Sequence, residues 1–237
     1  MASGGVPCGV PGFVPERASG VVPEGVPGGA LRGVAGGSPV DPDKKEAYYL
    51  RLHLLIVKEG TAILKARFDH SVPPQQLYAK LQQCMKTFNH AKKNNLLSKT
   101  QISNLFPQYR PPSSDTFDVS LLVYLLRNIC GLQSKSKWWS VNDNSKIPDK
   151  VLDEEADIVR LRNLRLQIQH KQGASLEQEE FETMWDLAEK VMLRLATKCN
   201  IPNQKQKIDA IKDKQLDFVT EEKRSTRALR DVVMDLI

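Results

Sequence analysis

The chain has 237 residues and a formal net charge of +6, with 34 Lys and Arg against 28 Asp and Glu. This length accommodates one domain of moderate size with tails, or two small domains. The charge permits an anionic partner without requiring one, and no run of five basic residues resembles a nucleic-acid-binding tail. No apolar run approaches the roughly 18 residues of a membrane span, and no secretory signal pattern is present.

Glycine and proline divide the chain into two compositional units. Eleven of the 14 glycines lie before residue 38 and seven of the 14 prolines lie before residue 43. Glycine maximises chain entropy and proline interrupts helices and sheet ladders, so residues 1–43 are predicted to be a disordered tether rich in Gly, Pro and Val.

The four cysteines, Cys8, Cys84, Cys130 and Cys199, are far apart and form no Cys-x-x-Cys motif. This spacing favours small buried side chains in a reducing compartment over a disulfide framework or a metal site. We therefore expect a cytoplasmic protein that holds no metal and no cofactor.

From residue 44 onwards, apolar residues recur at helical spacing and no stretch alternates like a half-buried strand, so the fold is predicted to be all-α. Ser98 is expected to N-cap one helix, Gly131 to end another, and Ser175-x-x-Gln178 to form a capping box. The predicted helices span 44–69, 75–92, 98–105, 115–129, 150–171 and 175–197.

The helices are predicted to form one domain over residues 44–198, followed by a break at Pro202. Residues 203–237 carry apolar residues at helical spacing and are interpreted as an exposed C-terminal amphipathic extension that binds protein partners. A truncation after Thr197 is therefore expected to leave the fold intact.

The charged helix over 150–171 has more apolar surface than one face requires. At 100° per residue, its apolar residues form two stripes, Leu161, Leu164 and Ile168 on one side and Val159, Leu166 and His170 on another. A helix of this kind is buried between neighbours or partly covered by a second subunit, so a homodimer is expected.

The same helix carries the candidate site, an Arg-x4-His pair formed by Arg165 and His170. The imidazole can act as a general base on a ribose hydroxyl, and the guanidinium can hold the phosphate without a metal. The two positions are about 140° apart on an ideal helix, so a composite site needs an unwound last turn or two subunits. Spacing alone favours a helix-terminal histidine and a surface arginine. Arg162, Arg165 and Lys171 are the candidate RNA contacts.

Residues 117–132 (FDVSLLVYLLRNICGL), a loop containing Trp138 and Trp139, EADIVRLRNLR followed by His170, and FETMWDLAEKVMLRL resemble, in that order, the HEPN superfamily. The resemblance covers roughly residues 46–196. It is strongest with the HEPN domain of the DAZ-interacting RING ubiquitin ligases and of related invertebrate signalling proteins. It implies a HEPN-like helical bundle with an extra N-terminal helical segment.

The resemblance also implies functions. HEPN ribonucleases use the two residues that Arg165 and His170 match, at a dimer cleft, but the polar residue that usually follows the arginine is Leu166 here. Arg127-Asn128 matches a segment typical of this branch and is expected to make a structural hydrogen bond. The Cys and His content cannot bind the two zinc ions of a RING.

The sequence thus favours a non-enzymatic adaptor built on a dimerising HEPN-like domain, in ubiquitin-linked or innate-immune-type signalling. The alternative is RNA binding or a metal-independent endoribonuclease. Trp138 and Trp139 either plug the edge of the core or stack on bases or a partner.

Overall fold

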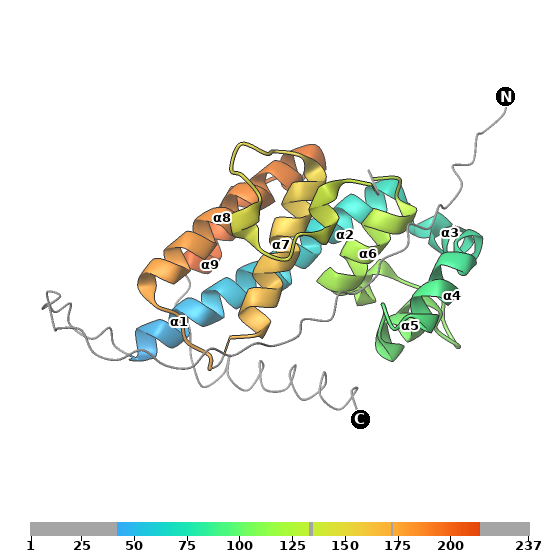
Figure 1. The fold of residues 1–237 in the computed structure, drawn as a ribbon, viewed down its shortest axis with the longest axis horizontal. Helices are drawn as coiled ribbons and strands as arrows, with labels where there is room; N and C mark the ends of the chain where they lie inside the picture. The colour runs from blue at the N-terminus through green and yellow to red at the C-terminus, as the bar shows by residue number, and fades with distance from the viewer. Residues whose placement is uncertain (1–41, 133–134, 172, 214–237) are drawn as a thin grey trace, which may run out of the picture.

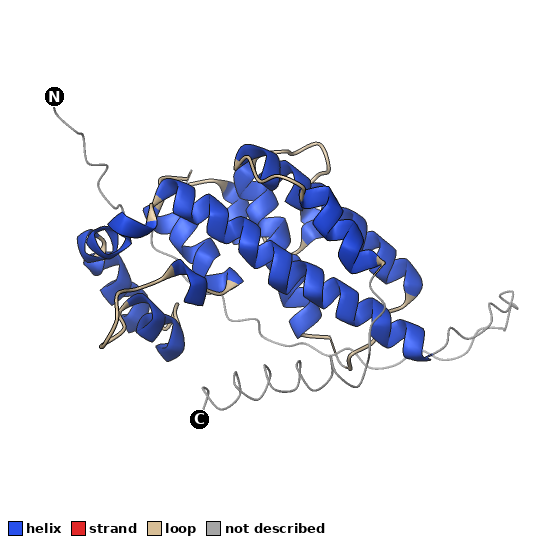
Figure 2. Cartoon of the chain, turned by 180° about the vertical axis from the view of Figure 1, so that it is seen from behind, coloured by secondary structure: helices blue, strands red, loops and turns tan. Residues whose placement is uncertain are grey.

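The computed structural model describes residues 42–132, 135–171 and 173–213, and within these ranges every regular element is helical and no strand occurs. The all-α prediction is therefore confirmed (Figure 1, Figure 2). Nearly all of the predicted tether at 1–43, and the part of the extension beyond residue 213, lie outside the described residues. None of the described helices is long and apolar enough to cross a membrane.

A long N-terminal helix runs beneath the other elements. It consists of α1 (Pro42–His53), a π-helical segment η1 (Leu54–Glu59) and α2 (Gly60–Ser71), and the backbone stays helical at both junctions. The helix predicted over 44–69 is confirmed and extends two residues further at each end. Its core-facing side chains are almost completely buried, namely Leu52, Leu55, Ile56, Ile63, Leu64 and Phe68.

Gly60 lets this helix approach two others closely. A Cβ atom at this position would lie 3.3 Å from both methyl carbons of Leu161 and from the terminal methyl of Met192. Those two side chains belong to α7 (Glu154–Gln169) and α8 (Gln178–Lys198), so the glycine marks the point where three helices meet.

Three short helices form one end of the molecule: α3 (Leu77–Gln83), α4 (Met85–Lys93) and α5 (Lys99–Leu105) (Figure 1). The helix predicted over 75–92 is interrupted at Cys84, whose φ of −97° and ψ of 16° end α3. Ser98 caps α5 as predicted, because its hydroxyl accepts from the backbone N–H of Gln101, whose side chain in turn accepts from the Ser98 N–H.

Helix α7 lies at the centre, packed against α8, α6 (Val119–Ile129) and the N-terminal helix. Both α6 and α7 begin four residues later than predicted. Before α6, Ser114–Thr116 forms a separate 3-10 turn and Asp118 caps the helix. Before α7, the backbone N–H of Val151 bonds the Pro148 carbonyl in a turn.

The capping box predicted at Ser175 and Gln178 is wrong. Glu177 occupies the N-cap position of α8, and no side chain caps this helix. The preceding residue explains the difference, because the buried Leu176 donates its backbone N–H to the Lys45 carbonyl at 3.0 Å. This contact holds the chain on α1 and delays the start of α8.

Helix α9 (Gln204–Lys212) packs on α8 and η1, contrary to the expectation of an exposed extension. Its Ile208 is completely buried and belongs to the main hydrophobic core. The Lys212 ammonium lies 5.6 Å from the ring centroid of the buried Trp185. We therefore expect truncation after Thr197 to expose core surface and to destabilise the fold.

Candidate functional site: two cavities beside the central helix

Helix α7 is enclosed by neighbours of the same chain over most of its length. Val159 and Leu161 are completely buried, Leu166 is half-buried, and only the last residues, including His170, are exposed. The central position expected of this helix is thus found. The stripe of Leu161, Leu164 and Ile168 is buried within one chain, whereas the second stripe is fully buried only at Val159, so the expected homodimer stays a prediction.

A buried ionic cluster joins α7 to α8. The Asp157 carboxylate has no exposed side-chain surface and accepts from Arg160 at 2.8 Å and from Arg194 at 2.6 and 2.7 Å. Arg160, 2% exposed, also donates to the carbonyls of Pro148 and Val151. The sequence pattern did not reveal this role, because Pro148, Val151 and Arg194 lie outside α7.

Arg162 anchors the loop that crosses α7. Its guanidinium donates to the carbonyls of Trp139 at 3.1 Å and Val141 at 2.6 Å, and to the side-chain oxygen of Asn142 at 3.1 Å. The adjacent, completely buried Asn163 donates to the Val141 carbonyl and to Asn144. Arg162 is therefore a structural residue of the loop, with its donors directed at the chain itself.

The side chains of the two loop tryptophans pack into the hydrophobic core, which was one of the two expectations for them. Trp138 is 9% exposed and donates its indole N–H to Asp153, while Trp139 is 3% exposed. The Arg127 guanidinium lies 5.8 Å from the Trp139 ring centroid. Asn128 makes the expected structural hydrogen bond, from its side-chain amide to the Tyr124 carbonyl at 2.8 Å.

On the α6 side of α7 lies a cavity of about 260 Å³, which we call the basic pocket. None of the described residues that line it is acidic, and two of them, Arg127 and Arg162, are basic. Burial lowers the pKa of Arg162, and the charge of Arg127 lowers it further. The lining also includes Val123, Tyr124, Asn128, Trp139, His90 and Leu96.

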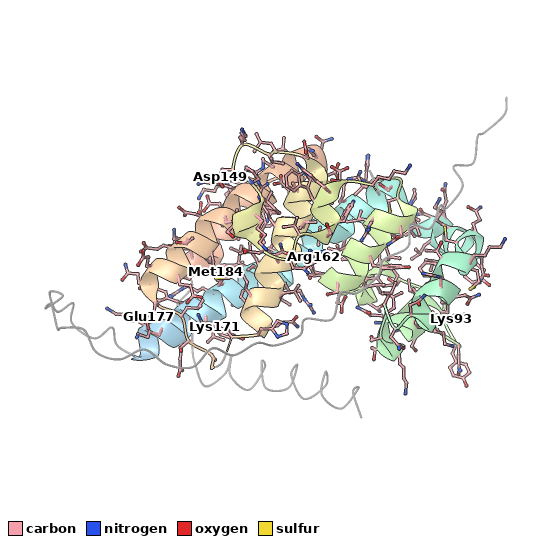
Figure 3. All side chains as sticks on the ribbon, in the orientation of Figure 1. Lys93, Asp149, Arg162, Lys171, Glu177 and Met184 are labelled. Atoms are coloured by element: carbon pink, nitrogen blue, oxygen red, sulfur yellow. The ribbon has the colours of Figure 1, made fainter. Side chains whose placement is uncertain are left out.

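On the α8 side lies a groove of about 900 Å³, which we call the acidic groove. It runs between the end of α7, the start of α8 and the loop before α7. Figure 3 shows Asp149, Lys171, Glu177 and Met184 together over this region, with Arg162 nearer α6. Five of the described lining residues are acidic, namely Asp143, Asp149, Glu177, Glu179 and Glu180.

Arg165 and His170 lie in different surroundings. Arg165 donates to the Ser120 hydroxyl on α6 at 2.9 Å and to Gln169 at 2.8 Å, and Ser120 lines the basic pocket. His170 is the C-cap residue of α7 and lines the acidic groove. The last turn of α7 does not unwind to bring the two side chains together, so one chain contains no assembled Arg-x4-His site.

The other candidate RNA contact is also occupied within the chain. The Lys171 ammonium forms an ion pair with the Glu180 carboxylate at the edge of the acidic groove. Arg162 is held by the loop, so the three proposed RNA contacts do not form one basic surface. Among the described residues, no group of three or more His, Cys, Asp or Glu side chains is arranged to hold a metal ion.

Two of the described cysteines, Cys130 and Cys199, are not activated thiols. Cys84, Cys130 and Cys199 form no disulfide, as expected of small side chains in a helical core. Burial raises the pKa of Cys130 to about 12 and also raises the pKa of Cys199, so both remain protonated at neutral pH. A thiolate nucleophile is therefore not provided by either residue.

Comparison with known proteins identifies relatives of this helical body. The family model for DZIP3/hRUL138-like HEPN matches residues 74–224, which is more than half of the chain. The human E3 ubiquitin-protein ligase DZIP3 is 25% identical over 178 residues, 73% of this chain and 14% of the human protein. The mouse protein of the same name is 26% identical over 156 residues, 64% of this chain and 12% of that protein. No solved structure matches. The chain belongs to the DZIP3/hRUL138-like HEPN family.

Proposed function

We propose that this chain is a non-enzymatic protein-interaction module whose acidic groove binds a basic, amphipathic segment of a partner. The observation that carries the proposal is the position of His170, which lies among carboxylates and apart from Arg165. A ribonuclease would need the imidazole and the guanidinium at one phosphodiester.

The charge of the groove opposes a nucleic acid. Its two cationic lining residues, Arg160 and Lys171, form ion pairs with Asp157 and Glu180, and Glu177 pairs with Lys45. The acidic lining residues outside these pairs are Asp143, Asp149 and Glu179. A phosphodiester placed at His170 would face the remaining carboxylates, and like charges at close range are repulsive. Lysine and arginine side chains of a partner would be attracted by the same field.

The groove also offers apolar surface. The half-buried Leu187 lines it beside the carboxylates, together with Ile147, Leu164 and Met184, which are each at most 8% exposed. Its volume, about 900 Å³, is at the upper end of typical ligand sites and accommodates several side chains. A segment with apolar residues on one face and basic residues on its flanks matches this lining, as in helix-in-groove recognition.

The proposed role extends to ubiquitin-linked signalling. The two relatives are named as E3 ubiquitin-protein ligases, and this chain aligns with only 14% and 12% of their length. We propose that the shared domain contributes binding, while ligase chemistry resides in other parts of such proteins. Self-association is a separate proposal, which sedimentation of the full chain at high micromolar concentration would contradict by finding only a monomer.

The test measures binding of a labelled amphipathic helix of about 14 residues, four turns long, carrying leucines on one face and lysines on its flanks. The full chain should bind it in a salt-dependent manner. Charge reversal of Asp149 and Glu179 to Lys should weaken binding by about tenfold or more, because close charge pairs steer and stabilise such complexes.

The matched control reverses Glu182 and Asp186, two exposed acidic residues of α8 that do not line the groove. This control should bind the lysine peptide nearly as well as the wild type. Equal losses in both variants, or equal binding of a peptide with glutamates in place of lysines, would contradict the proposal. Cleavage of single-stranded RNA in EDTA that is lost in His170→Ala would instead establish the ribonuclease.

A further inference from the structure

We infer that the basic pocket is a second binding site, one that takes an oxyanion carried on an apolar group, such as an acidic or phosphorylated side chain of a protein partner. The inference rests on the proposed function, because it assumes that the bound molecule is a protein. It concerns a different surface from the acidic groove, lined by other residues.

Arg127 is the main reason for this assignment. Its Nε atom is buried without a hydrogen-bond partner, and its guanidinium lies over the Trp139 ring, 5.8 Å from the centroid. Burial lowers the pKa of this group, which means that the surroundings disfavour its charge. Arginine nevertheless stays protonated and keeps five donors, so its charge is available to a ligand.

Arg162 adds a second charge that no carboxylate neutralises. Its guanidinium donates to carbonyl and amide oxygens, from the loop and from Asn163. Arg127 and Arg162 thus line one cavity with like charge and no acidic residue among its described lining. An anion in the cavity would offset the unfavourable interaction between them, and arginine binds carboxylate and phosphate through paired N–H donors.

The remaining lining suits an anion attached to an apolar group. Val123 is almost completely buried, whereas Leu96 is 41% exposed at the edge. Burial raises the pKa of the Tyr124 hydroxyl to about 12, so it stays protonated at neutral pH. It donates to the Thr87 carbonyl at 3.5 Å, a long contact that a bound oxyanion could replace. Asn128 and the exposed His90 add further polar lining.

The size and shape of the pocket favour a single side chain. A volume of about 260 Å³ is below the usual range of sites for cofactors or drug-sized ligands, roughly 300–1,000 Å³. Recognition of single-stranded RNA relies on a basic track and on open aromatic faces. Trp139 is only 3% exposed, and Arg127 lies over its ring, so this aromatic residue offers no open face to a base.

The first experiment titrates the ¹⁵N-labelled full chain with phenyl phosphate and, separately, with phenylacetate, using benzyl alcohol as the neutral analogue. The Trp139 indole N–H and the Arg127 Nε–H should shift saturably with at least one of the two anions. The neutral alcohol should bind at least about tenfold more weakly, which corresponds to one charge-assisted interaction. Equal binding of the alcohol would make the cavity merely apolar and would overturn the inference.

The variants separate the pocket from general charge effects. Arg127→Gln should abolish saturable binding of the anions, whereas Arg110→Gln, which removes the same charge from an exposed position, should leave it unchanged. Thermal unfolding of both variants checks that the fold is kept, and Arg127→Lys provides a second, charge-retaining substitution that should bind measurably but more weakly. Unchanged binding in Arg127→Gln, or no saturable shift in the wild type, contradicts the inference.

The class of partner is tested by competition. An acidic peptide with a glutamate or phosphotyrosine beside a leucine should displace the small anion, and a neutral glutamine version should not. Displacement by oligouridylate but not by either acidic peptide would assign the pocket to RNA and overturn the protein assignment. Failure here leaves the binding of basic peptides by the acidic groove intact, because Asp149 and Glu179 lie outside the basic pocket.

Discussion

The basic pocket and the acidic groove lie beside the same helix, yet the arginines that line them differ in whether they have an acidic partner. In the wall of the groove, Arg160 pairs with the buried Asp157, which it shares with Arg194, and it is further held by two carbonyl oxygens. In the pocket, Arg127 and Arg162 have no acidic neighbour among the described lining residues. The comparison teaches that a basic residue on α7 is informative about function only after its intrachain partners are known.

The same comparison explains why the Arg-x4-His motif is misleading in one chain. Arg165 points to the α6 side and bonds Ser120, while His170 is at the other cavity with the carboxylates. Five positions on a continuous helix separate the two groups by about 140°. A shared phosphate would have to reach both sides of α7.

Removing the Asp157 carboxylate should lower the free energy of unfolding more than any other change proposed here, because it removes the counter-ion of the arginine in the groove wall. Asp157→Ala leaves Arg160 without its buried counter-ion, and breaking such a pair costs about 3–5 kcal/mol of unfolding free energy. Chemical denaturation measures this loss. Asp186→Ala, at an exposed position of the next helix, should change stability by less than about 0.5 kcal/mol. Similar small losses of stability in both variants would mean that the ionic cluster contributes little to the free energy of unfolding.

Arg162→Gln should cause the next largest loss of unfolding free energy, because it removes an arginine that lines the basic pocket and anchors the loop. The substitution removes several charge-assisted hydrogen bonds to the loop over residues 139–142, so a loss of about 1.5–3 kcal/mol is expected. Amide hydrogen exchange should increase in this loop while the groove still binds the lysine peptide. Arg110→Gln serves as the control, and unchanged exchange in the loop would contradict the anchoring role.

A smaller effect is expected on the pH dependence of stability, through the partly buried His53. Burial lowers the pKa of His53 below its ordinary value of 6.5, and the neighbouring Arg165 charge lowers it further. The unfolded chain therefore binds the proton more tightly, so this contribution to stability is present above pH 6.5 and is lost as the pH falls below it. His53→Gln should show a shallower loss between pH 7.5 and 5 than the wild type. Parallel curves for the two proteins would contradict the assignment.

The smallest expected effect tests whether the two cavities act independently. Neutralising the groove with Asp149→Asn and Glu179→Gln should change phenyl phosphate binding to the pocket by less than about twofold, because exposed charges are screened within roughly 10 Å at 0.1 M salt. The titration described above measures it. A tenfold gain in affinity would show that the groove and the pocket form one electrostatic unit.

Periodicity was sufficient to predict the helices and the central place of α7, because its apolar residues repeat at helical spacing. It could not place Arg127 and Arg162 in one cavity, since they come from helices that are distant in the sequence. Nor could it reveal that Leu176 is held by a backbone bond to Lys45, which shifts the start of α8. The loop tryptophans had two open interpretations, and only tertiary packing decides between them.

The long N-terminal helix has a practical consequence for work on fragments of this family. The family model begins at residue 74, whereas the buried side chains of Leu52, Ile56 and Phe68 precede it. A protein expressed from residue 74 would present the apolar faces of α6, α7 and α8 to water and should aggregate or bind chaperones. Screens for partners should therefore use baits that retain this helix, or they will recover proteins that recognise unfolded chains.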